Sequence, residues 1–361
     1  MELEYRQAEA VVYWRKHQTT VPVSYGRSQT IWDSPTEQRR NSEYMALAVE
    51  AITVGTATQQ NQPTTVQNGR RSRAHRRLTK VFNSAKRVPF DDSSRIVFFS
   101  DCHRGNNGRA DEFAKNAALF LHALTHYYRE GFTYVEVGDG DDLWKHRRFG
   151  DIRRAHSRVF DLLHRFDRLG RLHLIVGNHD IQGRRRDRVE KDGIATHEGL
   201  VLRHSRTRQR IFVVHGHQAD FKSDQLHFVS RFVVRYIWKL LQFLGFENET
   251  GREGINQRQK GIDRRIIDWV RTHGSAIICG HTHRPVCPSN GGVPYFNTGS
   301  CLLPGILTGL EIQDGTIAPI RWTSTSARHR NGAVREVGAR QLIAPPTRLH
   351  DLSSLAAWGE C

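Results

Sequence analysis

Five short polar motifs, each placed directly after an apolar run rich in β-branched or aromatic residues, dominate the middle of the chain. The runs are RIVFF, FTYVEV, LHLIV, IFVV and SAIIC, and the motifs that follow them are SDCH (100–103), GDGDD (138–142), GNHD (177–180), HGH (215–217) and GHTH (280–283). Short apolar runs of this kind predict β-strands. In an open α/β sheet, ligands collect at the carboxyl ends of the strands. The pattern therefore predicts an α/β fold in which Asp, Asn and His side chains meet at one edge.

The segments between the first three motifs have helical periodicity. Apolar residues recur at helical spacing through 113–128, and a helix is predicted over 151–168, so the order of elements is βαβαβ. This order is typical of a mostly parallel, buried sheet. After residue 180 the pattern changes, and two sheets are expected because further strands are predicted. They fall at 198–204, 209–216, 275–280, 293–299, 308–315 and 316–322.

The motifs occupy one region of the chain, so we expect a single catalytic domain over 89–325. Residues 1–88 include a tract rich in Gln, Thr and Asn, which has too little apolar surface to order itself. We therefore expect a polar, largely disordered extension over these residues. Residues 326–361 are expected to form a loosely ordered tail. A helical insertion is expected at about 222–273, including an apolar helix from about 225 to 245.

The chain is strongly basic, with a net charge of +17 and a pI near 10.2, which argues for an anionic partner. A phosphate substrate, an acidic membrane surface and nucleic acid all fit, but no basic repeat interleaved with aromatic residues supports nucleic acid. Neither a signal peptide nor a run of about 18 apolar residues is visible, so we expect a cytoplasmic protein, with peripheral membrane contact left open. Five cysteines without regular spacing predict reduced thiols.

The residue types in the motifs suit hydrolysis of a phosphate ester. Two divalent ions about 3.5 to 4 Å apart can clamp the phosphate and make water acidic enough to act as nucleophile near neutral pH. Such a site needs a carboxylate between the metals, surrounded by oxygen and imidazole ligands. A mixed oxygen and nitrogen set favours Mn, Fe or Zn over Ca, and over Mg in an all-oxygen site. We therefore expect two divalent ions, Mn first, with Fe or Zn as alternatives.

The five motifs resemble those of the calcineurin-like metallophosphoesterases, whose D-x-H, G-D-x-x-D, G-N-H-D, H-G and G-H-x-H sequences occur here in the family's order. The resemblance covers about 95–325. It implies an α/β/β/α sandwich with two mixed β-sheets and a helical insertion. It also implies a metal-dependent hydrolase that acts on phosphate esters by in-line attack of a hydroxide held by the metals.

The resemblance also implies a role for each motif residue. It assigns the first metal to Asp101, His103, Asp139 and His283, and the second metal to Asp139, Asn178, His215 and His281. Asp139 would bridge the two ions, and Asn178 would also face the substrate. His179 would bind no metal and would act as transition-state donor or as the acid for the leaving oxygen. Asp142 would orient His179 through a hydrogen bond.

Several residues beside the motifs stay open. The HGH sequence offers two imidazoles, and we assign His215 to the metal and place His217 behind it. Arg104 could bind the substrate phosphate in bidentate fashion or be an exposed loop arginine, and Asn106 and Arg109 share that loop. Trp144 is expected to pack under the site rather than to bind substrate.

Within the family, SDCHRG, GDGDDLW and the insertion after HGHQ resemble the bacterial branch of the UDP-2,3-diacylglucosamine pyrophosphatases. This resemblance implies a phosphomonoester, phosphodiester or pyrophosphate substrate, either a phosphorylated small molecule or one linked to a lipid or nucleotide sugar. A serine/threonine-type protein phosphatase of the same fold is the first alternative. A nucleic-acid-binding protein or nuclease is the alternative from another class. The oligomeric state and the leaving group do not follow from the sequence.

Overall fold

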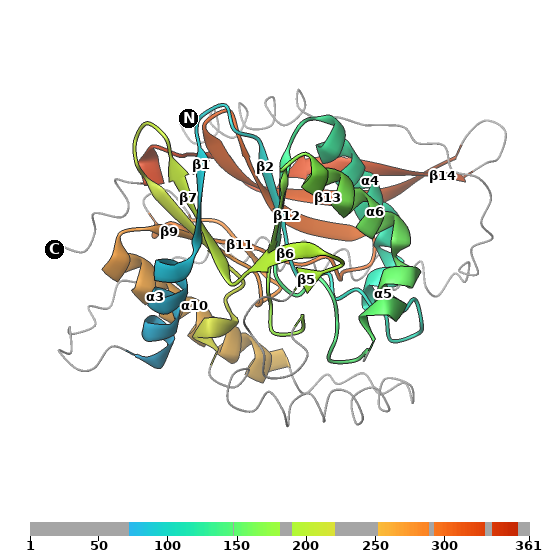
Figure 1. Cartoon of the computed structure of the whole chain (residues 1–361), viewed down its shortest axis with the longest axis horizontal. Helices are drawn as coiled ribbons and strands as arrows, with labels where there is room; N and C mark the ends of the chain where they lie inside the picture. The colour runs from blue at the N-terminus through green and yellow to red at the C-terminus, as the bar shows by residue number, and fades with distance from the viewer. Residues whose placement is uncertain are drawn as a thin grey trace, which may run out of the picture.

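The structure, a computed structural model, describes residues 72–146, 148–180, 190–220, 252–288, 292–328 and 334–352. In this part of the chain two β-sheets lie face to face, and helices cover the outer face of each (Figure 1). The layers therefore follow the order α/β/β/α. Both sheets contain parallel and antiparallel strand pairs, which confirms the predicted α/β class with two mixed sheets.

The first sheet holds the strands that carry the first three motifs. Its described strands run in the order β14-β13-β12-β2-β3-β4-β6-β5, with β15 paired to β13. Their bounds are β2 Ile96–Phe99, β3 Thr133–Val137, β4 Leu172–Ile175, β5 Glu190–Lys191, β6 Ile194–His197, β12 Ile306–Gln313, β13 Thr316–Arg328, β14 Val334–Leu342 and β15 Thr347–Arg348. Strands β2, β3 and β4 are parallel, as the βαβαβ pattern predicted.

The second sheet holds the strands that carry the last two motifs. Its described strands run in the order β1-β7-β8-β9-β11-β10. Their bounds are β1 Lys86–Phe90, β7 Gly199–His204, β8 Arg210–Val214, β9 Ala276–Cys279, β10 Pro285–Val286 and β11 Tyr295–Thr298. Strands β7 and β8 form an antiparallel hairpin, and β8 runs parallel to β9, so the motifs after β8 and β9 emerge at the same edge.

The helices divide between the two outer faces. They are α3 Arg73–Ser84, η2 Glu112–Lys115, α4 Ala117–Arg129, α5 Phe149–Ala155, α6 Ser157–Arg168, η3 His217–Ala219 and α10 Arg252–His273. Helices α4 and α6 cover the first sheet, while α3 and α10 lie together on the second (Figure 1). Each layer boundary has its own core. Along β2, Val97 and Phe99 pack toward the helices, while Ile96 and Phe98 pack between the sheets, because side chains alternate along a strand.

The N-terminal boundary predicted near residue 88 is wrong for residues 72–88. They form α3 and β1, and β1 pairs in parallel with β7 at the edge of the second sheet. Ser72 caps α3 by accepting a hydrogen bond from the backbone N–H of His75. Leu78, Val81 and Phe82 are buried against β7, β8 and α10. Residues 72–88 therefore belong to the folded domain, and residues 1–71 lie outside the described part of the chain.

Phe82 anchors α3, and its removal is expected to destabilise the domain. Its ring lies 5.3 Å from the Phe212 ring and 5.4 Å from the Trp269 ring, in edge-on contacts. Phe82→Ala in the full chain should lower the free energy of unfolding by about 3 to 5 kcal/mol, through lost burial and the cavity left behind. Denaturant unfolding measures this, with Lys80→Ala on the exposed face of α3 as control. Equal, small effects of both substitutions would mean that α3 does not stabilise the domain.

The C-terminal tail predicted for 326–361 is also wrong as far as residue 352. Strand β14 pairs with β13 over nine residues, and β15 pairs with the start of β13. Leu349 and Leu352 are buried in the core between the sheets. The pairing was missed because the basic and polar residues of β14 hide a strand at the edge of the sheet.

The helical insertion is described in part. The apolar helix predicted at about 225–245 lies outside the described residues. Helix α10 falls within the predicted insertion, and Ile262, Ile266 and Trp269 pack it against the second sheet. Across the described residues, no helix is both long and apolar enough to cross a membrane.

Candidate metal centre

The five motifs meet at one edge of the sandwich, where strands of both sheets end. SDCH, GDGDD and GNHD follow β2, β3 and β4 of the first sheet, and HGH and GHTH follow β8 and β9 of the second. Direct hydrogen bonds join the sheets at this edge. His215 Nδ1 lies 2.8 Å from the Val137 carbonyl oxygen, and the backbone N–H of His281 donates to Asp101 Oδ2 at 2.9 Å. The site therefore spans the boundary between the sheets.

The loops that carry the motifs have an unusual backbone. Asp101, His103, Asp139, His281 and His283 all have positive φ values, between 48° and 70°. Residues other than glycine rarely adopt this left-handed region, and such residues gather at functional sites. The loops are also closely packed, because a Cβ on Gly177 would lie 2.0 Å from Asp139 Oδ1. The glycine of GNHD is therefore needed for the close approach of two motifs.

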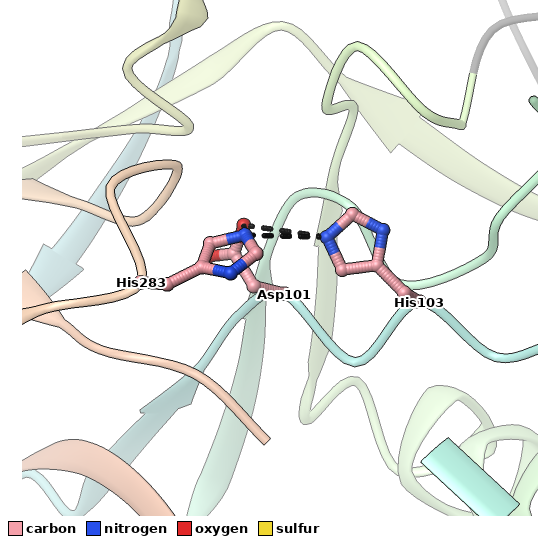
Figure 2. Close-up of side chains that lie close together, drawn as sticks. All are labelled: Asp101, His103 and His283. Carbon is pink, nitrogen blue, oxygen red and sulfur yellow. Dashed lines mark hydrogen bonds and ion pairs between the residues drawn. The ribbon is translucent and has the colours of Figure 1, made fainter. Parts of the chain in front are cut away.

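Asp101, His103 and His283 form the first cluster of donor atoms. Figure 2 shows the two rings pointing toward each other from opposite sides, with the Asp101 carboxylate beside them. His283 Nε2 lies 3.1 Å from Asp101 Oδ1 and 3.4 Å from His103 Nε2, and His103 Nε2 lies 3.8 Å from Asp101 Oδ1. Ligands about 2.0 to 2.2 Å from one ion are spaced about 3 to 3.5 Å apart, so the cluster has the size of a cation site.

Asp139, His215 and His281 form the second cluster. His215 Nδ1 is bonded to the Val137 carbonyl, so its Nε2 is left for a ligand and lies 3.2 Å from Asp139 Oδ2. Asn178 is buried beside them, at the loop after β4. The two clusters share one atom: Asp139 Oδ2 also lies 3.8 Å from His103 Nε2. This oxygen is placed between the clusters, where a bridging ligand would have to be.

Three donor atoms of the predicted ligands show that the residues fit metal ions. Asp101 Oδ1, Asn178 Oδ1 and His215 Nε2 are buried and make no aligned hydrogen bond within the described part of the chain. A buried polar atom without a hydrogen bond loses about 1 to 3 kcal/mol relative to a bonded one, so such atoms are normally satisfied in native proteins. One cation in each cluster would satisfy these atoms, Asp101 in the first cluster and Asn178 and His215 in the second, and carboxylate, amide and imidazole are ligand types for divalent metals.

The electrostatic environment keeps Asp101, Asp139 and His103 in the protonation state that binds a metal, whereas the neighbouring carboxylates, Asp139 and Asp101, raise the pKa values of His215 and His283. Burial raises the pKa of Asp101, but the neighbouring imidazoles, His283 first and then His215, together outweigh burial and the pKa falls to about 2. The pKa of Asp139 is also lowered, since the neighbouring imidazoles, His215 first, outweigh burial. Burial, reinforced by His179, lowers the pKa of His103 to about 4. At neutral pH the two carboxylates are ionised and the His103 ring is neutral, as metal binding requires.

His179 lies beside both clusters and is held from two sides. Its Nδ1 is 3.0 Å from Asp142 Oδ1, and the ring stacks on Trp144 with centroids 4.1 Å apart. Trp144 is itself fixed by a 2.6 Å hydrogen bond from Nε1 to the Asn178 carbonyl oxygen. Burial lowers the pKa of His179, but Asp139 and Asp142 outweigh it and the net pKa is raised. The ring is therefore oriented, and it is biased toward the protonated form.

The expectation that Arg104 binds substrate is wrong. Its side chain is fully buried, and its guanidinium donates two hydrogen bonds to Glu136, at 2.7 and 2.8 Å, and one to Asp141 at 2.6 Å. Lys191 adds a second cation, with Nζ 2.9 Å from both Asp141 and Asp180. Arg104 therefore belongs to a buried ion network behind the metal motifs. It cannot reach a phosphate in front of them.

The other neighbouring residues occupy more ordinary places. His217 starts η3, and its ring centroid lies 5.6 Å from that of His215 and outside the donor clusters found among the described residues. Asn106 and Arg109 are exposed in the loop after the first motif and do not line the cavity over the site. Trp144 packs under His179, as predicted.

A cavity of about 420 Å³ opens over the donor clusters. Seven of the predicted site residues line it, and two cationic side chains that line it were not predicted; the seven are His103, Asp139, Asp142, Asn178, His179, His281 and His283. Lys145 follows GDGDD and lies 3.4 Å from Asp142, and Arg258 of α10 pairs with Asp220. Sequence reasoning also missed Glu136, although a glutamate inside the apolar run FTYVEV signals a buried charge. No local signal marks Lys191 or Arg258.

Comparison with known proteins finds structural likeness but no sequence match. No protein-family model and no curated protein sequence matches the chain. Among solved structures, Vps29 from Chaetomium thermophilum is similar, with 11% sequence identity, a TM-score of 0.32, and an alignment covering 70% of this chain and 99% of that chain. The function is therefore argued from the site itself.

Proposed function

We propose that the chain is a hydrolase of phosphate esters that works with two divalent metal ions. The observation that carries this proposal is the position of Asp139 Oδ2, within 3.8 Å of an imidazole nitrogen from each donor cluster. When bound, two ions would neutralise charge on the phosphoryl oxygens and acidify water. The donor set contains three oxygen ligands and four imidazoles, which supports Mn, Fe or Zn.

The residues around the clusters suit the remaining tasks. Asp101 and Asp139 supply fixed negative charge, and Asn178 supplies a neutral amide at the edge of the cavity. His179 lines the same cavity and is oriented by Asp142, so its Nε2 is left to donate a proton to a leaving oxygen. Trp144 covers one face of that ring and keeps water away from it. Lys145 adds positive charge at the cavity wall.

The cavity supports a small phosphorylated or lipid-linked substrate over a protein substrate. Its wall is partly formed by Arg258, Gln259 and Ile262 of α10, which rise beside the donor clusters. A folded phosphoprotein would need the clusters at an open, shallow surface. The apolar helix predicted at about 225–245, which would hold acyl chains, lies outside the described residues. The lipid-linked substrate is therefore proposed on the resemblance of the motifs alone.

Purified full-length protein is expected to bind two divalent ions per chain and to hydrolyse bis-p-nitrophenyl phosphate. Chelation should abolish hydrolysis, and Mn²⁺ should restore it, because both ions take part in the reaction. Elemental analysis and initial rates measure the two quantities. A rate that is insensitive to chelation, or a stoichiometry that stays below two at saturating Mn²⁺, would contradict the proposal.

A substrate panel separates the remaining alternatives. Acylated and simple pyrophosphates, phosphomonoesters, a phosphoserine peptide and single-stranded DNA are compared at equal metal concentration. We expect a pyrophosphate or small ester to give the highest kcat/KM. Preference for the phosphopeptide would favour the protein-phosphatase alternative. Preference for DNA, with a steep loss of affinity as salt rises, would favour a nuclease.

A further inference from the structure

One carboxylate that no motif contains touches a predicted metal ligand. Asp220 lies directly after η3, five positions beyond His215, and is 2% exposed at the wall of the cavity. Its Oδ2 lies 3.2 Å from His281 Nε2. The same oxygen accepts a hydrogen bond from Arg258 Nη2 on α10. Asp220 therefore links α10 to a ring of the second donor cluster.

The contact decides which nitrogen of His281 faces a metal. An imidazole that gives one N–H to a carboxylate has the other nitrogen free for a metal, and such outer carboxylates fix the tautomer and orientation of metal-binding histidines. With Nε2 of His281 donating to Asp220, Nδ1 would be the atom left to bind a metal. His215 shows the same arrangement with the nitrogens exchanged, because its Nδ1 is bonded to the Val137 carbonyl. Both rings of the second cluster are therefore held from behind.

Helix α10 holds the GHTH loop at a second point. Gln259, next to Arg258, donates from Nε2 to the Thr282 carbonyl oxygen at 2.6 Å. Thr282 stands between the two histidines of the motif. Adjacent side chains of α10 thus hold the loop, Gln259 directly and Arg258 through Asp220. These contacts fix the position of the GHTH loop relative to α10.

We propose that Asp220 is a positioning residue for the second metal ion, acting through His281, with Arg258 fixing its carboxylate. The proposal rests on the proposed function only in that the donor clusters bind two ions. Outer-shell partners of this kind typically change metal affinity by about 10- to 100-fold. Loss of Asp220 should therefore weaken the second ion selectively, because His281 belongs to the second cluster and not to the first.

The test measures metal affinity in full-length variants. Asp220→Ala should lower the affinity for the second Mn²⁺ by about 10- to 100-fold in competition with a chelator, and leave the first within about twofold. Asp220→Asn keeps an acceptor oxygen but loses the charge, so its loss should be smaller. Electron paramagnetic resonance should show a coupled Mn pair in the wild type and an isolated ion in Asp220→Ala at the same metal concentration.

Asp263 provides a matched control. It is a buried aspartate that pairs with Arg284 and accepts a 2.7 Å hydrogen bond from Tyr295, so it shares the chemistry of Asp220 without touching a ligand ring. Asp263→Asn should leave both affinities unchanged. Wild-type affinity in both Asp220 variants would overturn the proposal, as would equal weakening of both ions in the Asp220 and Asp263 variants. If Asp220→Ala fails to fold, the affinities of Asp220→Asn and Arg258→Gln for the second Mn²⁺ test the proposal instead.

The proposal and the proposed function can fail separately. A wild-type protein that binds two ions but hydrolyses no ester of the panel would remove the proposed reaction, and the affinity loss in Asp220→Ala would still support the positioning role. If the protein hydrolyses esters but its affinity for the second ion is unchanged in the Asp220 variants, the proposed reaction stands and the positioning role of Asp220 is wrong. A wild-type protein that binds no metal pair would overturn both.

Discussion

Asp139→Asn is expected to abolish turnover and to lower the bound metal from two ions toward one or none. Asp139 Oδ2 is the atom placed between the clusters, 3.2 Å from His215 Nε2 and 3.8 Å from His103 Nε2. An asparagine has one carbonyl oxygen, no charge, and an NH2 group that cannot bind a cation. It can neither bridge two ions nor offset their repulsion. Elemental analysis and the rate at saturating Mn²⁺ measure the effect.

Asp141, two positions along the same motif, offers the control. Its carboxylate faces Arg104 and Lys191 in the buried ion network and not the donor clusters. Asp141→Asn should lower the free energy of unfolding by about 3 to 5 kcal/mol, because it leaves buried cations with less compensation. Its metal content should stay at two. Full activity of Asp139→Asn, or equal metal loss in both variants, would remove the bridging role.

His179→Ala is expected to keep both metals and to lower the turnover number by about 10² to 10⁴, the usual contribution of an acid or donor. His179 makes two contacts at the site. Its backbone N–H donates to Asp139 Oδ1 at 2.7 Å, and its ring Nδ1 contacts Asp142. The backbone bond survives the substitution. The loss should be largest for alkyl esters, whose leaving oxygen needs a proton, and smaller for p-nitrophenyl esters, whose leaving anion is already stable.

Asp142→Asn tests the proton-donor role of His179 by changing the residue that contacts its Nδ1. The amide can still contact His179 but no longer favours its protonated form, so we expect a smaller loss with the same dependence on the leaving group. Initial rates on the two ester types and metal content are measured in parallel. If metal content falls with the rate in His179→Ala, His179 is a ligand and its assignment as proton donor is wrong.

The sequence predicted the donor residues of the metal centre better than the residues that surround them, for a physical reason. Each motif follows its own strand, and parallel strands end at a common edge, so Asp101, Asp139 and Asn178 had to lie close together once β2, β3 and β4 paired. His215 and His281 follow the same logic in the second sheet. These placements need only strand prediction and a sheet, which local sequence patterns supply.

Arg104 shows where local reasoning ends. The residue follows a metal motif, and its neighbours along the chain suggest an exposed loop. Its position is set by Glu136, 32 residues away, and by an isolated bridge to Asp141. Nothing near Arg104 in sequence carries that information. The side chain is directed inward by partners that only the folded sheet brings together.

Helix α3 was missed for a different reason. Its basic residues dominate the composition of 70–77, and the polar tract before it suggested a continuous extension. Ala74, Leu78, Val81 and Phe82 nevertheless have helical spacing, and all four are buried. Periodicity was the correct signal, and average composition concealed it.

The distance along the chain between the donors determines when the site can exist during biosynthesis. Asp101 and the backbone of His281 are 180 residues apart, as are His103 and His283. A metal held by neighbouring residues can nucleate its own domain, as in small zinc modules. Here the ribosome must release the chain beyond residue 283, and both sheets must dock, before the donors meet. Each donor cluster would therefore be complete only after the GHTH motif has been synthesised and both sheets have docked.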